Sequence, residues 1–374
     1  MRWKRSQPYF KRQRDMTGTG NRRQETMTTR ERMKALALGQ RPDRVPLTLS
    51  ALGFCARIAG YPIAHIFDDP EKSFWAQVWT QEMYGSDSGP SYSFSMSIAW
   101  DFGGGIKFPT SRWQQVPEPE RFPVESEADV IRLEVPDVKT APSIQLAMEL
   151  SRLCQQHQRP IMFTIGSPFT WAGNLCGLDQ LCRWMMKKPE LAHRLLRLST
   201  DFCLQIAQYW VDTFGAQRVT PLVPTPAESN DVISPKQFEE FAFPYLKELC
   251  EKVLAMGVRR FYCHYCGEQN LNLPYLAQIP LGKAGFVSVG HQVDLNTAIK
   301  YFGDKYIIVG NVEPAMIQNG TPQQVYELAR QCIEKAKYAP SGFILCPGCE
   351  LPPMAPPYNV YMLKKAINDF GWYD

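Results

Sequence analysis

The feature that most constrains the fold is a series of short apolar runs that alternate with amphipathic helical patterns. Each run has the length of a strand and is apolar almost throughout, which is typical of strands buried on both faces of a parallel sheet. The runs lie at residues 160–165, 219–223, 258–263, 285–289, 306–309 and 342–345, and a further short strand is expected within residues 42–50. Seven or eight strand–helix units predict the α/β class with a (β/α)8 TIM barrel, and a doubly wound sheet is the alternative.

The helical patterns between these runs have the spacing of one buried stripe. In the clearest case, apolar residues recur at steps of four, three, four, four and three. This stripe consists of Leu191, Leu195, Leu198, Phe202, Ile206 and Tyr209. Further helices are expected at residues 28–39, 235–254, 294–302 and 321–337, where Ser, Thr or Asp near the start can cap the first turn.

Two segments do not fit the repeating pattern. Residues 86–140 are rich in Gly, Pro and aromatic side chains, and we expect an inserted excursion near the mouth of the barrel. Residues 1–26 carry eight Arg or Lys side chains against two acidic ones and lack apolar periodicity, which indicates a flexible basic extension. Residues 27–374 are then expected to form a single domain, with its first helix as an N-terminal helical extension of the barrel.

Composition argues against several classes of function. No stretch of about 18 apolar residues occurs, so no membrane span is expected. The net charge of +4 becomes −2 without residues 1–26, which does not favour nucleic-acid binding by the rest of the chain. The eleven cysteines show no secreted disulfide framework, and several lie within apolar helical patterns, so we expect buried thiols and a cytoplasmic protein.

One group of residues suggests metal chemistry. His264 and Cys266 follow an apolar run, and residues i and i+2 of a strand share a face. Cys346 and Cys349 stand at the end of another run, in the sequence Cys-Pro-Gly-Cys. Because active groups of a barrel gather at the carboxyl ends of its strands, we expect these side chains to lie together. Imidazole and thiolate together suit zinc.

The residues alone leave three arrangements open. Three protein ligands with one open position form a catalytic zinc site, whereas a fourth cysteine closes the site into a structural one. Cys346 and Cys349 also have the spacing of a redox pair that cycles as a disulfide. We favour the open, catalytic arrangement.

Taken together, the segments resemble the uroporphyrinogen decarboxylase superfamily, and within it the zinc-dependent corrinoid methyltransferases. The resemblance runs from about Thr29 to the C-terminus. Its carriers are Arg-Glu-Arg-Met-Lys-Ala-Leu at 30–36, Pro-Asp-Arg-Val-Pro at 42–46, Gly-Ser-Pro-Phe-Thr at 166–170, Ser-Pro-Lys-Gln-Phe-Glu-Glu-Phe at 234–241, Pro-Tyr at 244–245, His-Tyr-Cys-Gly at 264–267, Gly-Asn-Val-Glu-Pro at 310–314 and Pro-Gly-Cys-Glu-Leu-Pro-Pro at 347–353.

The resemblance implies a bound Zn2+ and a corrinoid (cobalamin) supplied by a partner protein. Matched residue by residue, the zinc ligands are His264, Cys266 and Cys349. The decarboxylase branch has an arginine-rich loop after the first strand. The chain departs from it, because Arg57 is the only arginine among residues 50–57. A metal-free porphyrinogen decarboxylase and a non-catalytic corrinoid- or zinc-binding protein are kept as alternatives.

Two methyl transfers compete within the methyltransferase branch. One takes the methyl group from a methoxylated aromatic compound to the Co(I) corrinoid, which is O-demethylation; the other takes it from a methylated corrinoid protein to a thiol such as coenzyme M. Candidate walls of a flat aromatic slot are Phe163, Phe169, Trp171, Trp184 and the stretch from Trp100 to Trp113. These lead us to expect O-demethylation, with thiol methylation as the alternative.

The strand order also suggests further site residues. Glu228, Asp231, His291 and Asn311 are expected in loops after successive strands, where they could hold polar groups of the substrate or orient a ligand. The expected partners are a corrinoid protein and a small-molecule methyl donor, but neither nucleic acid nor a membrane, and a homodimer is left open.

Overall fold

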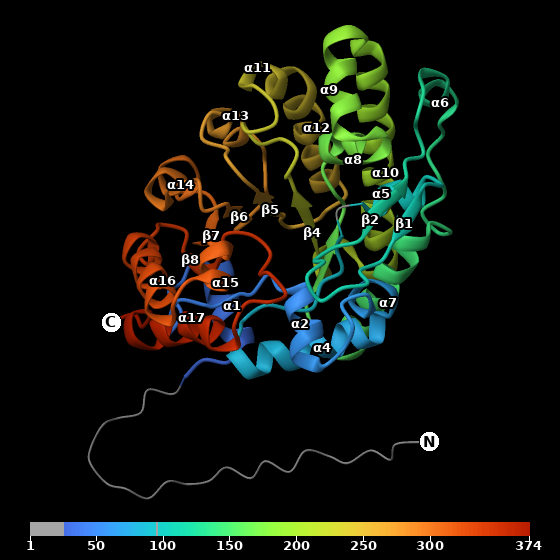
Figure 1. Cartoon of the computed structure of the whole chain (residues 1–374). Coiled ribbons are helices and arrows are strands. Elements are labelled where there is room, and N and C mark those ends of the chain that lie inside the picture. The colour runs from blue at the N-terminus through green and yellow to red at the C-terminus, as the bar shows by residue number, and fades with distance from the viewer. Residues whose placement is uncertain (1–25, 95) are drawn as a thin grey trace, which may run out of the picture.

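The centre of the molecule is a sheet of six parallel strands that neighbour one another in chain order (Figure 1). The computed structural model describes residues 26–94 and 96–374, so the expected basic extension lies outside the described residues except for Thr26. The strands are β3 (Ile161–Thr164), β4 (Val219–Pro224), β5 (Tyr262–Tyr265), β6 (Phe286–Val289), β7 (Ile307–Val312) and β8 (Phe343–Pro347). The α/β class and the TIM-barrel topology are therefore as expected.

Two extended segments, rather than regular strands, complete the ring between β8 and β3. Leu47 bridges Leu345 of β8 in parallel, and Thr48 N–H donates to the Leu345 carbonyl over 2.9 Å. Asp87 N–H donates in turn to the Leu47 carbonyl, and Thr164 Oγ1 of β3 donates to the Tyr92 carbonyl over 3.1 Å. The strand expected within residues 42–50 is thus reduced to two isolated bridges, the one from Leu47 and an antiparallel one between Arg44 and Trp372.

Helices cover the outside of the ring. Before β3 these are α2 (Leu52–Ala59), α3 (His65–Asp68), α4 (Pro70–Tyr84) and α7 (Pro142–Gln156). After β3 they are α8 (Pro168–Cys176), α9 (Leu178–Lys187), α10 (Pro189–Phe214), the 3-10 turn η1 (Ala216–Arg218), α13 (Leu273–Leu276), α14 (Leu295–Phe302), α15 (Pro314–Asn319), α16 (Pro322–Ala336) and α17 (Pro357–Phe370). The stripe predicted for α10 faces the core through Leu191, Leu195, Phe202 and Ile206. No helix in the described part of the chain is long and apolar enough to cross a membrane.

The helix expected at residues 235–254 is interrupted. It begins as α11 (Pro235–Gln237), widens into the π-helical turn η2 (Phe238–Ala242) and continues as α12 (Phe243–Ala255). Pro244 lies in the first turn of α12 and has no N–H to donate to the preceding turn, which accounts for the interruption at this point.

The predicted excursion forms a separate layer beside the barrel. It contains α5 (Ser97–Asp101), the antiparallel pair β1 (Gly105–Lys107) and β2 (Glu118–Arg121), and α6 (Glu127–Arg132). Val124 N–H donates to the Leu175 carbonyl of α8 over 3.1 Å. The Gln115 side chain lies close enough to the carboxyl group of Glu350, beside Cys349, to lower its pKa, so the excursion reaches the mouth as expected.

The helix α1 (Thr29–Ala37) closes the opposite end of the barrel. Met33 and Leu36 pack against Ile307, Val309 and Ile344, which extend inward from β7 and β8. A capping box between Thr28 and Glu31 begins the helix, as the sequence indicates. The N-terminal helical extension is thus part of the core.

Candidate metal centre

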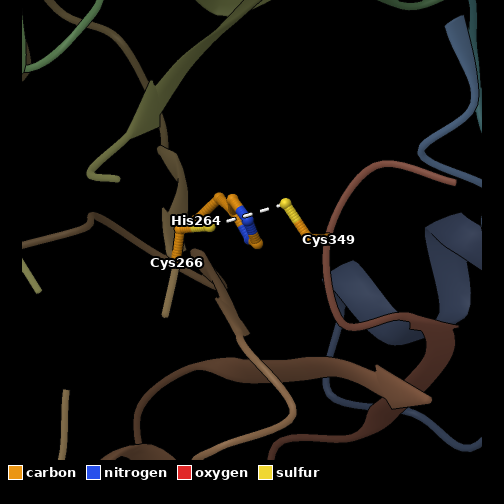
Figure 2. Close-up of side chains that lie close together, drawn as sticks. All are labelled: His264, Cys266 and Cys349. Carbon is orange, nitrogen blue, oxygen red and sulfur yellow. Dashed lines mark hydrogen bonds between the residues drawn. The ribbon is translucent and has the colours of Figure 1, made fainter. Parts of the chain in front are cut away.

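Two strands and one turn bring three metal-ligand side chains together. His264 lies within β5, Cys266 follows its last residue, and Cys349 lies in the turn after β8. One ligand atom from each of the three lies within 4.8 Å of the others, and the two sulfur atoms are 3.4 Å apart (Figure 2). Tyr265 points the other way and meets the Phe302 ring of α14 at 5.9 Å, as alternation along a strand requires.

Glycines allow the ligand-bearing segments to approach one another. A Cβ on Gly290, after β6, would lie 2.9 Å from the backbone nitrogen of Gly267, which follows Cys266. A Cβ on Gly348 would lie 2.9 Å from the backbone nitrogen of His291. The loop after β6 therefore touches both the chain beside Cys266 and the turn that carries Cys349.

Cys346 lies apart from this group. It belongs to β8, is only 2% exposed, and packs inside the barrel with Ile307, Val309 and Ile344. Burial raises the pKa of its thiol to about 11. A buried, protonated thiol below the mouth is a poor metal ligand and a poor redox nucleophile.

The two thiols of the triad share one negative charge when no metal is present. The Cys266 thiol hydrogen-bonds Cys349 and, together with His264, lowers the pKa of Cys349 to about 4 against the opposing effect of burial. The same contact and burial raise the pKa of Cys266 far above its ordinary value. Deprotonation, which metal binding requires, is thus already favoured at one of the two sulfurs.

The donor set fits zinc. One imidazole and two thiols are ligands of zinc, whereas magnesium and calcium take oxygen ligands. All three side chains are half-buried, so they lie under the surface and remain reachable from the mouth. Three ligands in this grouping leave a fourth coordination position for a substrate atom.

Glu228 is one of the four further residues named from the sequence, and it is the most deeply buried, at 1% exposure. Thr170 Oγ1 donates to its carboxyl group over 2.6 Å, and Ser167 Oγ donates to it as well. Burial raises the pKa of this carboxyl to about 7. Glu228 therefore joins the loop after β4 to the start of α8, close enough to Cys266 to influence its charge.

The other three lie in different surroundings. Asp231 and His291 are exposed at the mouth, and His291 lies against Gly348. Asn311 lies within β7 rather than in the loop after it, which corrects its expected position. Its Nδ2 donates to the carbonyls of Gly290 and Val293 over 3.0 and 2.7 Å, so it supports the loop after β6.

Sequence reasoning missed two polar residues beside the triad. Ser288 Oγ lies 3.0 Å from His264 Nδ1. Glu350 follows Cys349, receives a hydrogen bond of 3.4 Å from Gly53 N–H, and has a pKa raised to about 7 by burial. No signal in the sequence distinguishes Ser288 from a serine with a purely structural role in a strand. Glu350 directly follows a predicted metal ligand, and this position was a signal that could have been used.

Four of the aromatic residues proposed as walls of a flat slot belong to the core, whereas Trp113, at the end of the proposed stretch from Trp100, is 65% exposed. Phe163 stacks on Trp210 of α10 at 5.0 Å, and Trp171 meets Phe202 of the same helix at 5.9 Å. Phe169 and Trp184 are at most 5% exposed. They fill the space between the barrel and its helices, where each large ring buries a large apolar area.

Comparison with known proteins now places the chain. The family model described as uroporphyrinogen decarboxylase (URO-D) matches residues 28–370. The chain belongs to this family. Among solved structures, a methyltransferase from Methanosarcina mazei superposes with a TM-score of 0.77 at 22% identity, covering 92% of this chain and 99% of its own, which shows the shared fold.

Two relatives within the uroporphyrinogen decarboxylase family indicate the branch. A methylated-thiol–coenzyme M methyltransferase of Methanosarcina mazei is 26% identical over 330 residues, which are 82% of this chain and 81% of the relative. A methylcobamide:CoM methyltransferase of Methanosarcina barkeri is 23% identical over 354 residues, which are 92% of this chain and 98% of the relative. The expected methyltransferase branch of the family is thereby supported.

Proposed function

We propose that this protein is a corrinoid-dependent methyltransferase that moves a methyl group from a methylated corrinoid protein to a small thiol. The observation that carries the proposal is the open group of His264, Cys266 and Cys349 at the barrel mouth. The names of the two relatives, which refer to methylated thiols, methylcobamide and coenzyme M, favour the same direction of transfer.

The chemistry requires a sulfur nucleophile and a leaving group that keeps two electrons. The thiolate sulfur of the substrate attacks the methyl carbon, a new S–C bond forms, and the Co–C bond breaks with both electrons left on cobalt as Co(I). Zinc held by the triad would supply the Lewis acidity that keeps a substrate thiol deprotonated at neutral pH.

The residues of the chain would bind and orient the reactants. The metal would be held by His264, Cys266 and Cys349. The hydrogen bonds of Glu228 and Asn311 hold the loops after β4 and β6 in place. Asp231 and His291 are exposed at the mouth and would face the substrate or the corrinoid protein.

O-demethylation of a methoxylated aromatic compound is the weaker candidate. Its support was the set of aromatic walls, and four of those side chains are buried against helices. A porphyrinogen decarboxylase is weaker still, because Arg57 donates to the carbonyls of Pro353 and Ala355 and is therefore already engaged by the loop after β8. All eleven cysteines are unpaired, which suits a reducing cytoplasm as the proposed location.

The decisive experiment measures cobalt by absorbance. The zinc-loaded protein is incubated with a methylated corrinoid protein and a panel of thiols, and separately with Co(I) corrinoid protein and a panel of methoxyarenes. We expect loss of methylcobalt with the thiols and no cobalt methylation from the methoxyarenes. Methylation of Co(I) by a methoxyarene, with no reaction of the thiols, would instead establish O-demethylation.

The ligand assignment has its own test in single alanine variants. We expect one zinc ion per chain in the unchanged protein, and loss of zinc in His264→Ala, Cys266→Ala and Cys349→Ala, measured by metal analysis after dialysis. Cys346→Ala is the control, because its thiol lies inside the barrel, and it should retain zinc. Retention in Cys349→Ala with loss in Cys346→Ala would show that the wrong cysteine was assigned.

A further inference from the structure

A buried serine contacts the imidazole of the triad from behind. His264 of β5 and Ser288 of β6 are register partners in the parallel pair, so their side chains extend inward from adjacent strands. Ser288 Oγ lies 3.0 Å from His264 Nδ1, and Ser288 is only 2% exposed. The serine is thus the hydrogen-bond partner that the structure gives this nitrogen.

The contact distinguishes the two nitrogen atoms of the imidazole. A ring nitrogen engaged by a hydroxyl group does not bind a metal, so Nε2 is the atom left for the mouth. The hydroxyl group of Tyr262, two residues before His264 on β5, lies close enough to Ser288 for the serine to lower the pKa of the tyrosine. The polar groups thus form a chain that begins in the barrel interior and ends at the metal-ligand cluster.

We infer that Ser288 is the positioning residue of the centre, holding His264 with Nδ1 protonated and Nε2 free as the metal ligand. In this arrangement His264 Nδ1–H donates to Ser288 Oγ, and the Ser288 hydroxyl donates to the Tyr262 oxygen. The opposite polarity would place a proton on Nε2, where it blocks metal binding.

Removing the hydroxyl group has a defined consequence. In Ser288→Ala the Nδ1 atom loses this acceptor, so the ring no longer favours the tautomer with a free Nε2 and is less firmly oriented. Loss of such a hydrogen bond behind a metal-bound histidine typically weakens metal affinity about 10- to 100-fold. Ser288→Thr keeps the hydroxyl group and should restore most of the affinity.

The test measures two quantities, since the inference rests on the proposed zinc centre. Zinc affinity is determined by competition with a chromogenic chelator, and the His264 tautomer is determined by 15N NMR of the metal-free protein. We expect weaker zinc binding and a mixed tautomer in Ser288→Ala, with both restored in Ser288→Thr. Ser199→Ala is the matched control, because Ser199 is fully buried on α10 and its hydroxyl group has no partner among the described residues.

The outcomes separate this inference from the proposed function. If the unchanged protein binds no zinc, the proposed function fails, while the NMR spectrum still decides the tautomer. If Ser288→Ala binds zinc as tightly as the unchanged protein and keeps the same tautomer, the inference is overturned and the zinc centre stands. If Ser288→Ala does not fold, Tyr262→Phe provides the test, because it removes the acceptor of the Ser288 hydroxyl and should shift the tautomer ratio.

Discussion

Gly348 controls where Cys349 lies. A Cβ at this position would be 2.9 Å from the His291 nitrogen and 3.4 Å from the His291 Cβ, so the turn must move to accept one. We expect Gly348→Ala to displace the Cys349 sulfur and to lower zinc affinity at least about tenfold, because metal sites require their ligands within roughly 0.5 Å of the productive geometry. Chelator competition measures the effect.

The control for this prediction is another glycine without such a contact. The nearest atoms to a Cβ on Gly89 belong to Pro160 and begin at 3.5 Å, which is ordinary contact. Gly89→Ala should bind zinc like the unchanged protein. Equal affinities in both variants would mean that the turn after β8 tolerates a side chain and that its position is not set by Gly348.

Asp101 should make stability depend on pH. Burial raises the pKa of its carboxyl to about 7, against two hydrogen bonds from Ser143, while the unfolded chain keeps the ordinary value of 3.8. Between pH 3.8 and about pH 7, the folded state holds a proton on Asp101 that the unfolded chain has released. The contribution of this proton to the unfolding free energy is therefore complete below pH 3.8 and is lost as the pH rises toward 7. The slope is at most about 1.4 kcal/mol per pH unit.

Urea denaturation of the unchanged protein and of Asp101→Asn between about pH 5 and pH 8 measures this effect. The unchanged protein should lose unfolding free energy relative to the Asn variant as the pH rises. Asp304→Asn, at an exposed position, should run parallel to the unchanged protein. Parallel curves for Asp101→Asn would show that its carboxyl is ionised throughout.

At the scale of single residues, the sequence predicts the features that the alternation of side chains along one strand determines. The shared face of His264 and Cys266 follows from their spacing alone. The choice between Cys346 and Cys349 does not, because it depends on where β8 ends and its turn begins. Ser288 and the burial of Phe163 depend on which strand or helix is adjacent, which spacing within one segment does not contain.

At the scale of elements, the contacts of α1 should contribute strongly to the unfolding free energy. Arg32 is 4% exposed and makes ion pairs of 2.7 Å with both Asp43 and Asp87. Arg32→Ala leaves the largely buried Asp43 carboxylate without its ion-pair partner and leaves Asp87 with Arg44 alone, at 3.2 Å, and breaking such a pair typically costs about 3–5 kcal/mol. We expect that loss in the unfolding free energy, measured by urea denaturation.

Arg132→Ala is the matched control. Arg132 pairs with Asp129 over 2.9 Å, but its side chain is 73% exposed, so its loss should cost less than about 1 kcal/mol. A similarly small loss in Arg32→Ala would mean that the ion pairs of Arg32 add little to the stability and that other contacts, such as those of Met33 and Leu36, hold α1.

Prolines account for some of the elements that the sequence predicted poorly. Pro46 and Pro90 lie in the two extended segments between β8 and β3, and neither has an N–H for a ladder of hydrogen bonds. Pro244 acts in the same way on the helix at 235–254. The other apolar runs became β3 to β8, although β4 contains Pro221, and their ends are displaced by up to four residues because pairing with neighbours sets the ends.

At the scale of the whole molecule, the two ends of the barrel have different tasks. The end covered by α1 contains buried ion pairs and apolar packing, whereas the opposite end contains the metal-ligand group. We predict that a shortened chain beginning at Met27 keeps the melting temperature and the activity of the full chain, because Met27 still offers its N–H to Asp43 and its carbonyl to Arg32. Scanning calorimetry and the thiol methylation assay measure both. A fall of several degrees would mean that residues 1–26 contact the barrel.

The position of Cys349 has a consequence for the order in which the protein is made. Cys266 and Cys349 are 83 residues apart, so a growing chain that has just completed β5 offers only His264 and Cys266. Two ligands on an unfinished barrel hold zinc far more weakly than three on a folded one. The three ligands are therefore available together only after the last strand has been synthesised, so tight binding of zinc by this triad requires a completed barrel.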